Sequence, residues 1–251
     1  MIYNILYMES FSNLIEFYDE LFPVTDSLKS FCQQLKNKFN YPPKSLQIGC
    51  NTGTFSFFLA KNGWNSTGLE TVPSLLDSSC AKRRLQLLSI RFFKLSTSEM
   101  GSVLGPGFYD FISCLDNRVL FLKTAESVKQ FFVDTKKLLS KNGVLLLHTF
   151  NMEHLEKNYT NVMASRSCER AAFYSKIEEK REGTFILNQE LENSNGDILP
   201  VVQNEKIFPL TQKNILSFGK DAGFKHINFY GDFNGSKFTK DSLYTVAVLR
   251  A

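Results

Sequence analysis

The feature that most constrains the fold of this chain is a repeated pattern in which a helical segment ends at a glycine and an apolar run follows. The tripeptide KNG closes two such segments and DAG closes a third. Glycine is the usual residue at the left-handed position just beyond a helix, so we expect Gly63, Gly143 and Gly223 to end helices. Strands that alternate with helices along a chain are typical of a parallel sheet covered by helices.

Five short apolar runs between the helical segments are predicted strands. Their apolar residues are nearly continuous rather than alternating, which is typical of strands buried on both faces of a parallel sheet. Thr124 precedes an apolar stripe at helical spacing, and we expect it to cap that helix. The predicted strands are SLQI (45–48), STGLE (66–70), IRFFKL (90–95), YDFISCL (109–115) and GVLLLHTF (143–150). They predict a doubly wound α/β sheet.

The chain changes character at about residue 171. Three segments of mixed polarity, 171–182, 184–193 and 198–210, predict antiparallel strands, and an Asn-Gly pair between the last two suits a hairpin. We expect these strands to form an insertion packed over one rim of the main sheet. A helix and two closing strands follow. Because no helix separates those two strands, we expect them to be antiparallel neighbours.

Composition bounds the class of protein. The 29 basic and 25 acidic side chains of this 251-residue chain are interspersed, which argues against a dedicated nucleic-acid surface. The 5 cysteines form no CxxC pair, so neither a disulfide framework nor a zinc site is predicted. No apolar stretch is long enough to span a bilayer, and the N-terminus lacks a signal-peptide pattern. We expect a soluble, cytoplasmic protein with no metal site and no membrane partner.

The stretch SLQIGCNTGTF, residues 45–55, predicts a ligand. It reads as a strand, a glycine turn and the start of a helix, and ligands of open α/β sheets bind beyond the strand ends at such turns. The glycines fall at Gly49 and Gly53, a tighter spacing than the dinucleotide fingerprint. Asn51 tolerates a left-handed conformation, so we expect the turn to keep its shape. Glu70 ends the next strand and can accept hydrogen bonds from both ribose hydroxyls, which predicts a nucleoside.

The order of these motifs resembles that of the class I S-adenosylmethionine-dependent methyltransferases, over most of the chain. The first motif of that family commonly reads Leu-Asp-Ile-Gly-Cys-Gly-Thr-Gly, and residues 46–53 here read LQIGCNTG. GLETVPSLL is similar to the second motif, RFFKLSTSEM to the third, YDFISCLDNRVLFL to the fourth and LLSKNGVLLLHTFN to the fifth. The final helix, DAGF and the two closing strands match the reversed C-terminal hairpin of the family.

The resemblance implies a fold. It is a Rossmann-like, doubly wound, mostly parallel seven-stranded sheet with an antiparallel last strand, completed by an N-terminal helical lid and a small antiparallel β insertion. The implied domains are the lid at 1–43, the cofactor-binding core at 44–165, the insertion over the substrate site at 166–210 and the completion of the core at 211–251.

The resemblance also implies a cofactor, S-adenosyl-L-methionine. Glu70 would hold its ribose, Leu75 would pack near the adenine, and Ser96 stands where the family often has an Asp that reaches the adenine amino group. The implied cofactor-binding residues are Gly49, Cys50, Asn51, Gly53, Glu70, Thr71, Leu75, Ser96, Thr97, Leu115 and Asn117. Three departures from the family pattern, Gln47 for Asp, Asn51 for Gly and Ser96 for Asp, are expected to weaken cofactor binding without abolishing it.

The implied chemistry is in-line transfer of a methyl group from a sulfonium to a nucleophile, for which positioning suffices and a base is optional. The candidate catalytic residues are His148 and Asn151 at the end of the fifth strand and Tyr18 in a lead helix, FYDELFP, that resembles a lid over the cofactor. His148, Asp116 or Tyr18 would accept a proton, and the sequence does not choose among them.

Three arginines, Arg118, Arg166 and Arg170, are candidates for binding an anionic acceptor, with solvated surface arginines as the alternative. The first functional hypothesis is methyl transfer to a small molecule by a monomer or homodimer. The alternatives are an RNA or protein methyltransferase, and a non-catalytic binding protein that kept the fold. We expect a roof over the strand ends for the first, a broad basic cleft for the second and side chains filling the cofactor cavity for the third.

Overall fold

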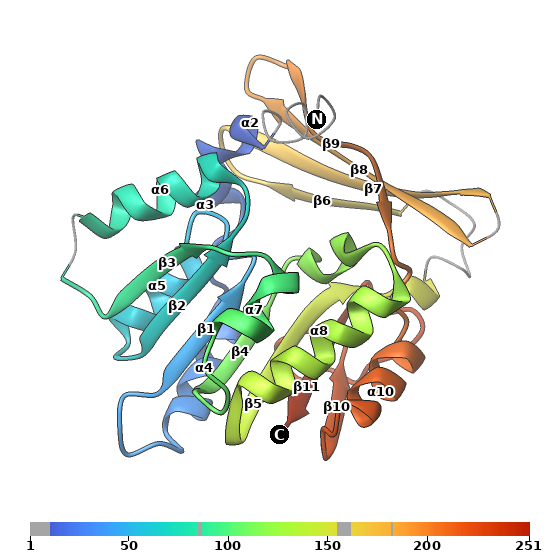
Figure 1. The fold of residues 1–251 in the computed structure, drawn as a ribbon. Helices are drawn as coiled ribbons and strands as arrows, with labels where there is room; N and C mark the ends of the chain where they lie inside the picture. Colours follow the sequence, from blue (N-terminus) through green and yellow to red (C-terminus); the bar gives the residue numbers. More distant parts are fainter. Residues whose placement is uncertain (1–10, 85–86, 155–161, 182) are drawn as a thin grey trace.

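The computed structural model describes residues 11–84, 87–154, 162–181 and 183–251. A seven-stranded sheet carries helices on both faces, and a separate four-stranded sheet lies above the ends of its strands (Figure 1). The predicted lid is described from residue 11 onward, because residues 1–10 lie outside the described part of the chain.

The large sheet has the order β10-β11-β5-β4-β1-β2-β3. The pairs β1–β2, β1–β4, β2–β3 and β4–β5 are parallel, whereas β11 is antiparallel to both β5 and β10. This confirms the predicted fold class, including the antiparallel last strand. The strands are β1 (Lys44–Ile48), β2 (Asn65–Glu70), β3 (Ile90–Lys94), β4 (Tyr109–Cys114), β5 (Leu139–Phe150), β10 (His226–Tyr230) and β11 (Tyr244–Arg250).

Helices cover the two faces of the large sheet because successive strand residues point to opposite sides. In β4, Phe111 packs with α4 and α5, while Ile112 joins the larger cluster that includes α6, α7, α8 and α10. The helices are α4 (Asp26–Lys36), α5 (Thr54–Lys61), α6 (Pro73–Arg84), α7 (Thr97–Val103), α8 (Ala125–Leu138) and α10 (Gln212–Asp221). The strands β4 and β5 are buried from both sides, as their continuous apolar runs predict.

Two of the three predicted helix ends are confirmed and one is wrong. Gly63 and Gly223 have φ values of 82° and 91°, and the Thr124 side chain caps α8. Gly143 instead lies inside β5, which begins directly after α8. A Cβ atom at position 143 would lie 3.0 Å from the Tyr109 carbonyl oxygen, so this glycine permits a close strand approach.

The small sheet is antiparallel, with the order β6-β7-β8-β9. It begins at Val162, so the domain boundary predicted at 166 falls inside β6, a strand that the sequence analysis missed. The expected Asn-Gly turn does connect β8 to β9, with Gly196 at a φ of 83°. The strands are β6 (Val162–Ser167), β7 (Ala171–Arg181), β8 (Thr184–Asn193) and β9 (Ile198–Ile207).

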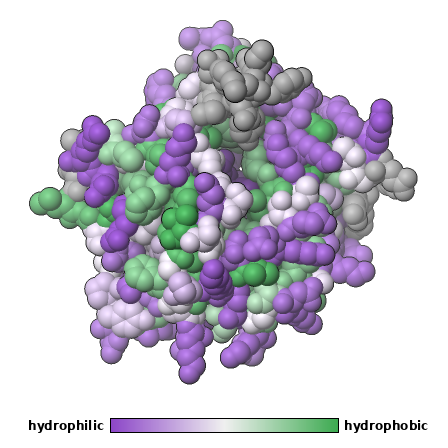
Figure 2. All heavy atoms as spheres, in the orientation of Figure 1, coloured by the Kyte–Doolittle hydropathy of each residue, from purple (hydrophilic) through white to green (hydrophobic). Residues whose placement is uncertain are grey.

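Two short helices, α2 (Ser12–Ile15) and α3 (Tyr18–Leu21), lie between the two sheets. α2 contacts α6 and β9, and α3 contacts β7. Together with the small sheet they form a roof over the carboxyl ends of the central strands (Figure 1). The face seen in Figure 2 is largely hydrophilic, with separate apolar patches between the polar side chains. Among the described residues, no helix has the length and apolar character needed to cross a membrane.

Candidate cofactor and acceptor site

The glycine turn after β1 has the predicted shape. Gly49, Asn51 and Gly53 have φ values of 69°, 52° and 82°, so Asn51 occupies a left-handed position as expected. Its side-chain amide donates to the Gly49 carbonyl oxygen at 3.1 Å, which ties the turn to itself. Gln47 is buried in β1 and accepts a hydrogen bond from Ser56 in α5 at 2.7 Å. Both departures from the family pattern therefore stabilise the local structure.

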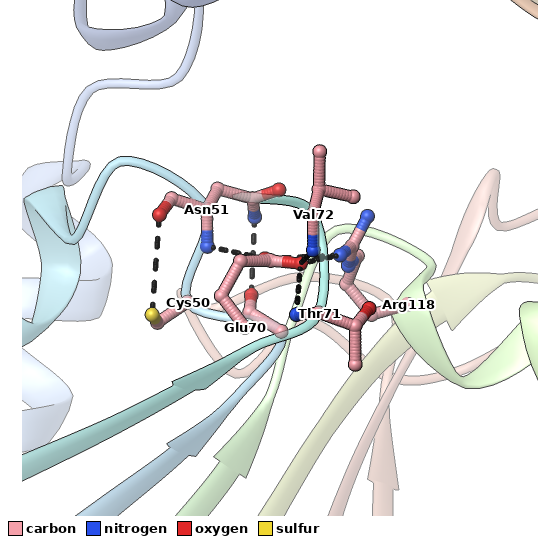
Figure 3. A network of polar contacts seen from close by, with 7 residues as sticks. Cys50, Asn51, Glu70, Thr71, Val72 and Arg118 are labelled. Atoms are coloured by element: carbon pink, nitrogen blue, oxygen red, sulfur yellow. Dashed lines mark hydrogen bonds and ion pairs between the residues drawn. The ribbon is translucent and has the colours of Figure 1, made fainter. Parts of the chain in front are cut away.

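Glu70, at the end of β2, is the centre of a dense polar network (Figure 3). Its side chain is fully buried. The carboxylate accepts backbone N–H groups of Asn51 at 2.9 Å, Thr71 at 2.8 Å and Val72 at 3.0 Å. The residue expected to hold a ribose thus also fixes the glycine turn to the end of the neighbouring strand.

The Arg118 guanidinium is the fourth group on this carboxylate. Arg118 is the first residue of the 3₁₀ helix η1 (Arg118–Leu122), which follows β4. The Arg118 Nη2 atom lies 2.8 Å from Glu70 Oε1 and 3.0 Å from Glu70 Oε2. Its side chain crosses the glycine turn so closely that a Cβ atom at Gly49 would lie 2.6 Å from Arg118 Nε. The guanidinium also lies near the Phe11 and Phe121 rings. Arg118 was predicted to bind an acceptor, and here it binds Glu70.

A cavity of about 230 Å³ lies beside this network; we call it the nucleoside cavity. Its walls bring together five of the predicted cofactor-binding residues, Gly49, Glu70, Thr71, Ser96 and Thr97. Arg118 and the apolar residues Ile48, Leu69, Val72, Leu95, Phe121 and Leu122 complete the lining. The lining combines apolar side chains with a few polar ones, which is the usual character of a small-molecule site.

A second cavity, of about 210 Å³, lies at the ends of β4 and β5; we call it the acceptor cavity. Asp116, His148 and Arg166 line it together with aromatic side chains that include Phe233 and Tyr244. A small space of about 40 Å³, lined by Tyr18, Asn51, Asn117 and Arg118 among others, lies between the glycine turn and the roof. Asp116 and Arg166 line both this space and the acceptor cavity.

Asp116 and Arg166 form an ion pair of 3.1 Å, and each side chain is partly exposed. The Arg166 guanidinium lies 4.8 Å from the centre of the Phe22 ring. Phe22 belongs to the stretch FYDELFP, residues 17–23, which we call the lead segment. Asp116 has a φ of 50°, an unfavourable value for a residue other than glycine. Backbone strain of this kind, at the rim of a cavity, is common at functional sites.

The His148 imidazole is neutral at pH 7, and its hydrogen lies on Nε2. Its Nδ1 accepts the Asp116 backbone N–H at 3.3 Å, so in this tautomer Nε2 carries the hydrogen. Burial lowers the pKa of His148 to about 4, although the Asp116 carboxylate opposes this shift. The ring packs against Phe233 and Tyr244. These contacts disfavour His148 as a general base.

Tyr18 is buried in α3, and its ring stacks on Phe22 with 4.7 Å between the ring centres. Burial, followed by the Asp116 charge, raises the pKa of its phenol well above the ordinary value. The phenol therefore stays protonated at neutral pH, and Tyr18 lines the small space. Asp116, with a carboxylate at the rim of the acceptor cavity, is the better-placed proton acceptor.

Several of the predicted site residues do not line the nucleoside cavity. Asn151 is buried and donates to the Ser242 carbonyl oxygen at 2.8 Å, which supports the loop before β11. Arg170 pairs with Glu16 and Glu20 and so joins the lead segment to the small sheet. Cys50, Gly53 and Leu75 also lie outside the lining of the nucleoside cavity, and Cys50 and Leu75 are buried in the core. Leu115 is buried and lines the acceptor cavity instead. Asn117 accepts the Phe150 N–H.

A contact between the lead segment and the glycine turn was not predicted from the sequence. The Asp19 carboxylate accepts hydrogen bonds from Thr52 at 2.6 Å, Thr54 at 2.5 Å and Lys82 at 2.5 Å. Burial raises the pKa of Asp19, but these hydrogen bonds outweigh burial and hold it below the ordinary value. The acidic residue in FYDELFP and the two threonines flanking Gly53 were the available signals. This contact holds α3 closed over the turn.

Residues 46–147 match a family model described as a methyltransferase domain. A protein of Geobacillus sp. (strain WCH70), described only provisionally as a methyltransferase, is 26% identical over 153 residues, which cover 58% of this chain and 61% of the relative. A ubiquinone biosynthesis O-methyltransferase of Rickettsia conorii is 26% identical over 106 residues, 42% of this chain and 34% of the relative. The chain thus spans about three fifths of the length of the Geobacillus protein and about one third of the length of the Rickettsia protein.

Solved structures share the fold over nearly the whole chain. The CcbJ methyltransferase from Streptomyces caelestis superposes with a TM-score of 0.75 at 15% identity, covering 98% of this chain and 97% of the other. An amino pentose methyltransferase from Micromonospora echinaspora, solved with S-adenosylmethionine bound, gives 0.65 at 18% identity and 89% coverage of both chains.

Residues 46–147 thus match the methyltransferase domain model, and the chain shares its fold with solved structures of S-adenosylmethionine-dependent methyltransferases. One structure of this fold, the amino pentose methyltransferase, holds S-adenosylmethionine, the cofactor that the sequence predicts for this chain.

Proposed function

We propose that this protein binds S-adenosylmethionine at the glycine turn and transfers its methyl group to a small-molecule acceptor. The observation that carries the proposal is the convergence of the left-handed turn, the anchored Glu70 carboxylate and the nucleoside cavity at the carboxyl end of β1 and β2. The residues that fit the nucleoside half are Glu70 for the ribose and the cavity walls around Ser96 and Thr97 for the base.

A small acceptor is supported by the roof. α2, α3 and the small sheet cover the strand ends, and Phe173, Ser175 and Gln189 of that sheet line the space next to the turn. A macromolecular substrate needs an open cleft at this edge. Two of the similar proteins are named for small-molecule chemistry, one for ubiquinone biosynthesis and one for an amino pentose, which agrees with an enclosed site.

The chemistry that the cofactor supplies is an activated methyl group, so the contribution of this chain is alignment and exclusion of water. The aromatic walls Phe22, Phe233 and Tyr244 would orient an acceptor in the acceptor cavity. The Asp116 carboxylate would accept the proton that an alcohol or protonated amine releases. The Tyr18 hydroxyl would donate a hydrogen bond, because its raised pKa keeps it protonated.

Calorimetric titration with S-adenosylhomocysteine tests the cofactor part of this proposal. We expect the wild type to bind, and Glu70→Gln to bind about tenfold or more weakly, because a charged acceptor for the ribose hydroxyls is lost. Glu126→Gln, an exposed change in the first turn of α8, is the matched control and should bind like the wild type. Circular dichroism verifies that each variant is folded. Absence of binding to the wild type would contradict the proposal.

The acceptor part needs a separate assay. Methyl transfer from radiolabelled S-adenosylmethionine to pools of small alcohols, phenols and amines should label at least one pool, and Asp116→Asn should lower the rate for the labelled acceptor. Labelling of RNA or protein in place of every small-molecule pool would contradict a small acceptor.

One observation favours a second candidate, a non-catalytic binding protein. The Arg118 side chain lies across Gly49 and occupies Glu70, which places protein atoms in the space where the nucleoside is proposed to bind. If Arg118 is fixed there, the protein keeps the fold and binds no S-adenosylhomocysteine. The titration above separates the two candidates.

A further inference from the structure

The Glu70 carboxylate has no spare capacity to accept hydrogen bonds. A carboxylate offers about four lone-pair positions. Oε1 accepts from the Thr71 and Val72 N–H groups and from Arg118 Nη2, while Oε2 accepts from the Asn51 N–H and from the same Nη2. These contacts fill the available positions (Figure 3). A ribose hydroxyl therefore needs one of these donors to leave.

Arg118 is the donor that is able to leave. The three N–H groups belong to the backbone of the glycine turn and of the two residues directly after Glu70, so moving them would dismantle the turn. Arg118 reaches Glu70 from a separate element, η1, through a flexible side chain. Its withdrawal would break the ion pair with Glu70 and the contacts with the Phe11 and Phe121 rings, and would leave the three backbone N–H groups on Glu70 in place.

The position of Arg118 also separates two cavities. It lines both the nucleoside cavity and the small space beside Tyr18 and Asp116. The nucleoside cavity, at about 230 Å³, lies below the range of about 300–1,000 Å³ that is usual for ligand sites. Withdrawal of the side chain from Gly49 would enlarge the chamber and open it toward the acceptor side.

We propose that Arg118 is an internal competitor for the cofactor site. Its guanidinium takes, on Glu70, the place of the ribose hydroxyls, and the cofactor binds when Arg118 withdraws. This inference rests on the proposed function, specifically on Glu70 as the ribose acceptor. The measured affinity for the cofactor is then the intrinsic affinity reduced by the fraction of molecules in which Arg118 is withdrawn.

The test compares S-adenosylhomocysteine affinity in three proteins by calorimetry: the wild type, Arg118→Met and Arg91→Met. Methionine keeps much of the apolar stem of Arg118 and removes its charge. We expect Arg118→Met to bind about tenfold tighter or more, because the competing state is removed. Arg91 is exposed, bonds to Asn65 and does not line the nucleoside cavity, so Arg91→Met should match the wild type. Equal or weaker binding by Arg118→Met overturns the inference.

A second measurement on the wild type serves if Arg118→Met fails to fold. Side-chain NMR of arginine labelled with ¹⁵N resolves the Arg118 guanidinium, assigned by its loss in Arg118→Lys. We expect separate Nη signals while the Glu70 pair restricts rotation, and their merging as S-adenosylhomocysteine saturates the protein. Separate signals that persist at saturation overturn the inference. If neither the wild type nor Arg118→Met binds S-adenosylhomocysteine, the proposed function fails and the inference fails with it. If the wild type binds while its Arg118 Nη signals stay separate, the inference alone is overturned.

Discussion

Two arginine–carboxylate pairs lie at the same edge of the large sheet and differ in their surroundings. Arg118–Glu70 is buried, with Glu70 fully enclosed and three backbone N–H groups on its carboxylate. Arg166–Asp116 has a single contact of 3.1 Å, and the two side chains are 29% and 26% exposed. The comparison shows a buried end, where three backbone N–H groups hold the carboxylate and Arg118 is its side-chain donor, and a partly solvated end where the pair has room to adjust.

The largest expected effect is on the buried pair. Glu70→Ala should lower the free energy of unfolding by about 3–5 kcal/mol, because it leaves the Arg118 charge and three backbone donors without their acceptor. Urea unfolding measures this. A loss below about 1 kcal/mol would mean that Glu70 has little part in fixing the turn, and the contrast between the two pairs would disappear.

The next effect concerns His148, which borders the exposed pair. Its folded pKa of about 4 lies below the ordinary value of 6.5, so the unfolded chain binds a proton at a pH where the folded protein does not. Stability should therefore fall as pH decreases from 6.5 toward 4. Between about pH 7 and about pH 5 we expect the wild type to lose about 2 kcal/mol more than His148→Gln. An equal loss in both proteins would show that His148 does not titrate in this way.

Substitutions in the glycine turn, which adjoins the buried pair, should change stability by a smaller amount. Asn51→Val should destabilise the protein by about 1–2 kcal/mol, since a β-branched residue resists the φ of 52°. Asn51→Gly should change stability by less than about 1 kcal/mol, because relief at φ offsets the lost bond to the Gly49 carbonyl. Thermal and urea unfolding of both variants check the order, and a tolerated valine would refute the account of the turn.

The smallest effect is expected at the exposed pair. Asp116→Asn should lower the free energy of unfolding by about 1 kcal/mol or less, because the pair is partly solvated and has one direct contact. Its effect on S-adenosylhomocysteine affinity should also be small. A stability loss as large as that of Glu70→Ala would show that the two pairs are equally structural.

The sequence predicted the parts of the molecule that depend on local pattern. The central strands, the left-handed Asn51 and the position of Glu70 follow from burial, backbone preference and spacing. Gly143 was misread because a glycine that permits close packing looks the same in sequence as one that ends a helix. Arg118 was placed with the acceptor because its partner on β2 is far away in the chain.

The roof was predicted only in outline. Ser175 and Gln189 stand at inward positions of β7 and β8, pair across the two strands and are joined by a hydrogen bond of 2.9 Å. They interrupt rows of apolar inward residues, so their polarity was a signal that alternation analysis of each strand would detect. Which cavity they line depends on how the small sheet packs on the large one, and that is a tertiary property.

A crystal structure of the wild-type protein with S-adenosylhomocysteine would show directly whether the cofactor replaces Arg118 on Glu70. We predict ribose hydroxyls within hydrogen-bond distance of the Glu70 carboxylate, the base in the nucleoside cavity beside Ser96 and Thr97, and the Arg118 guanidinium withdrawn from Glu70. A ligand bound away from the glycine turn, with the Arg118–Glu70 pair intact, would contradict the account.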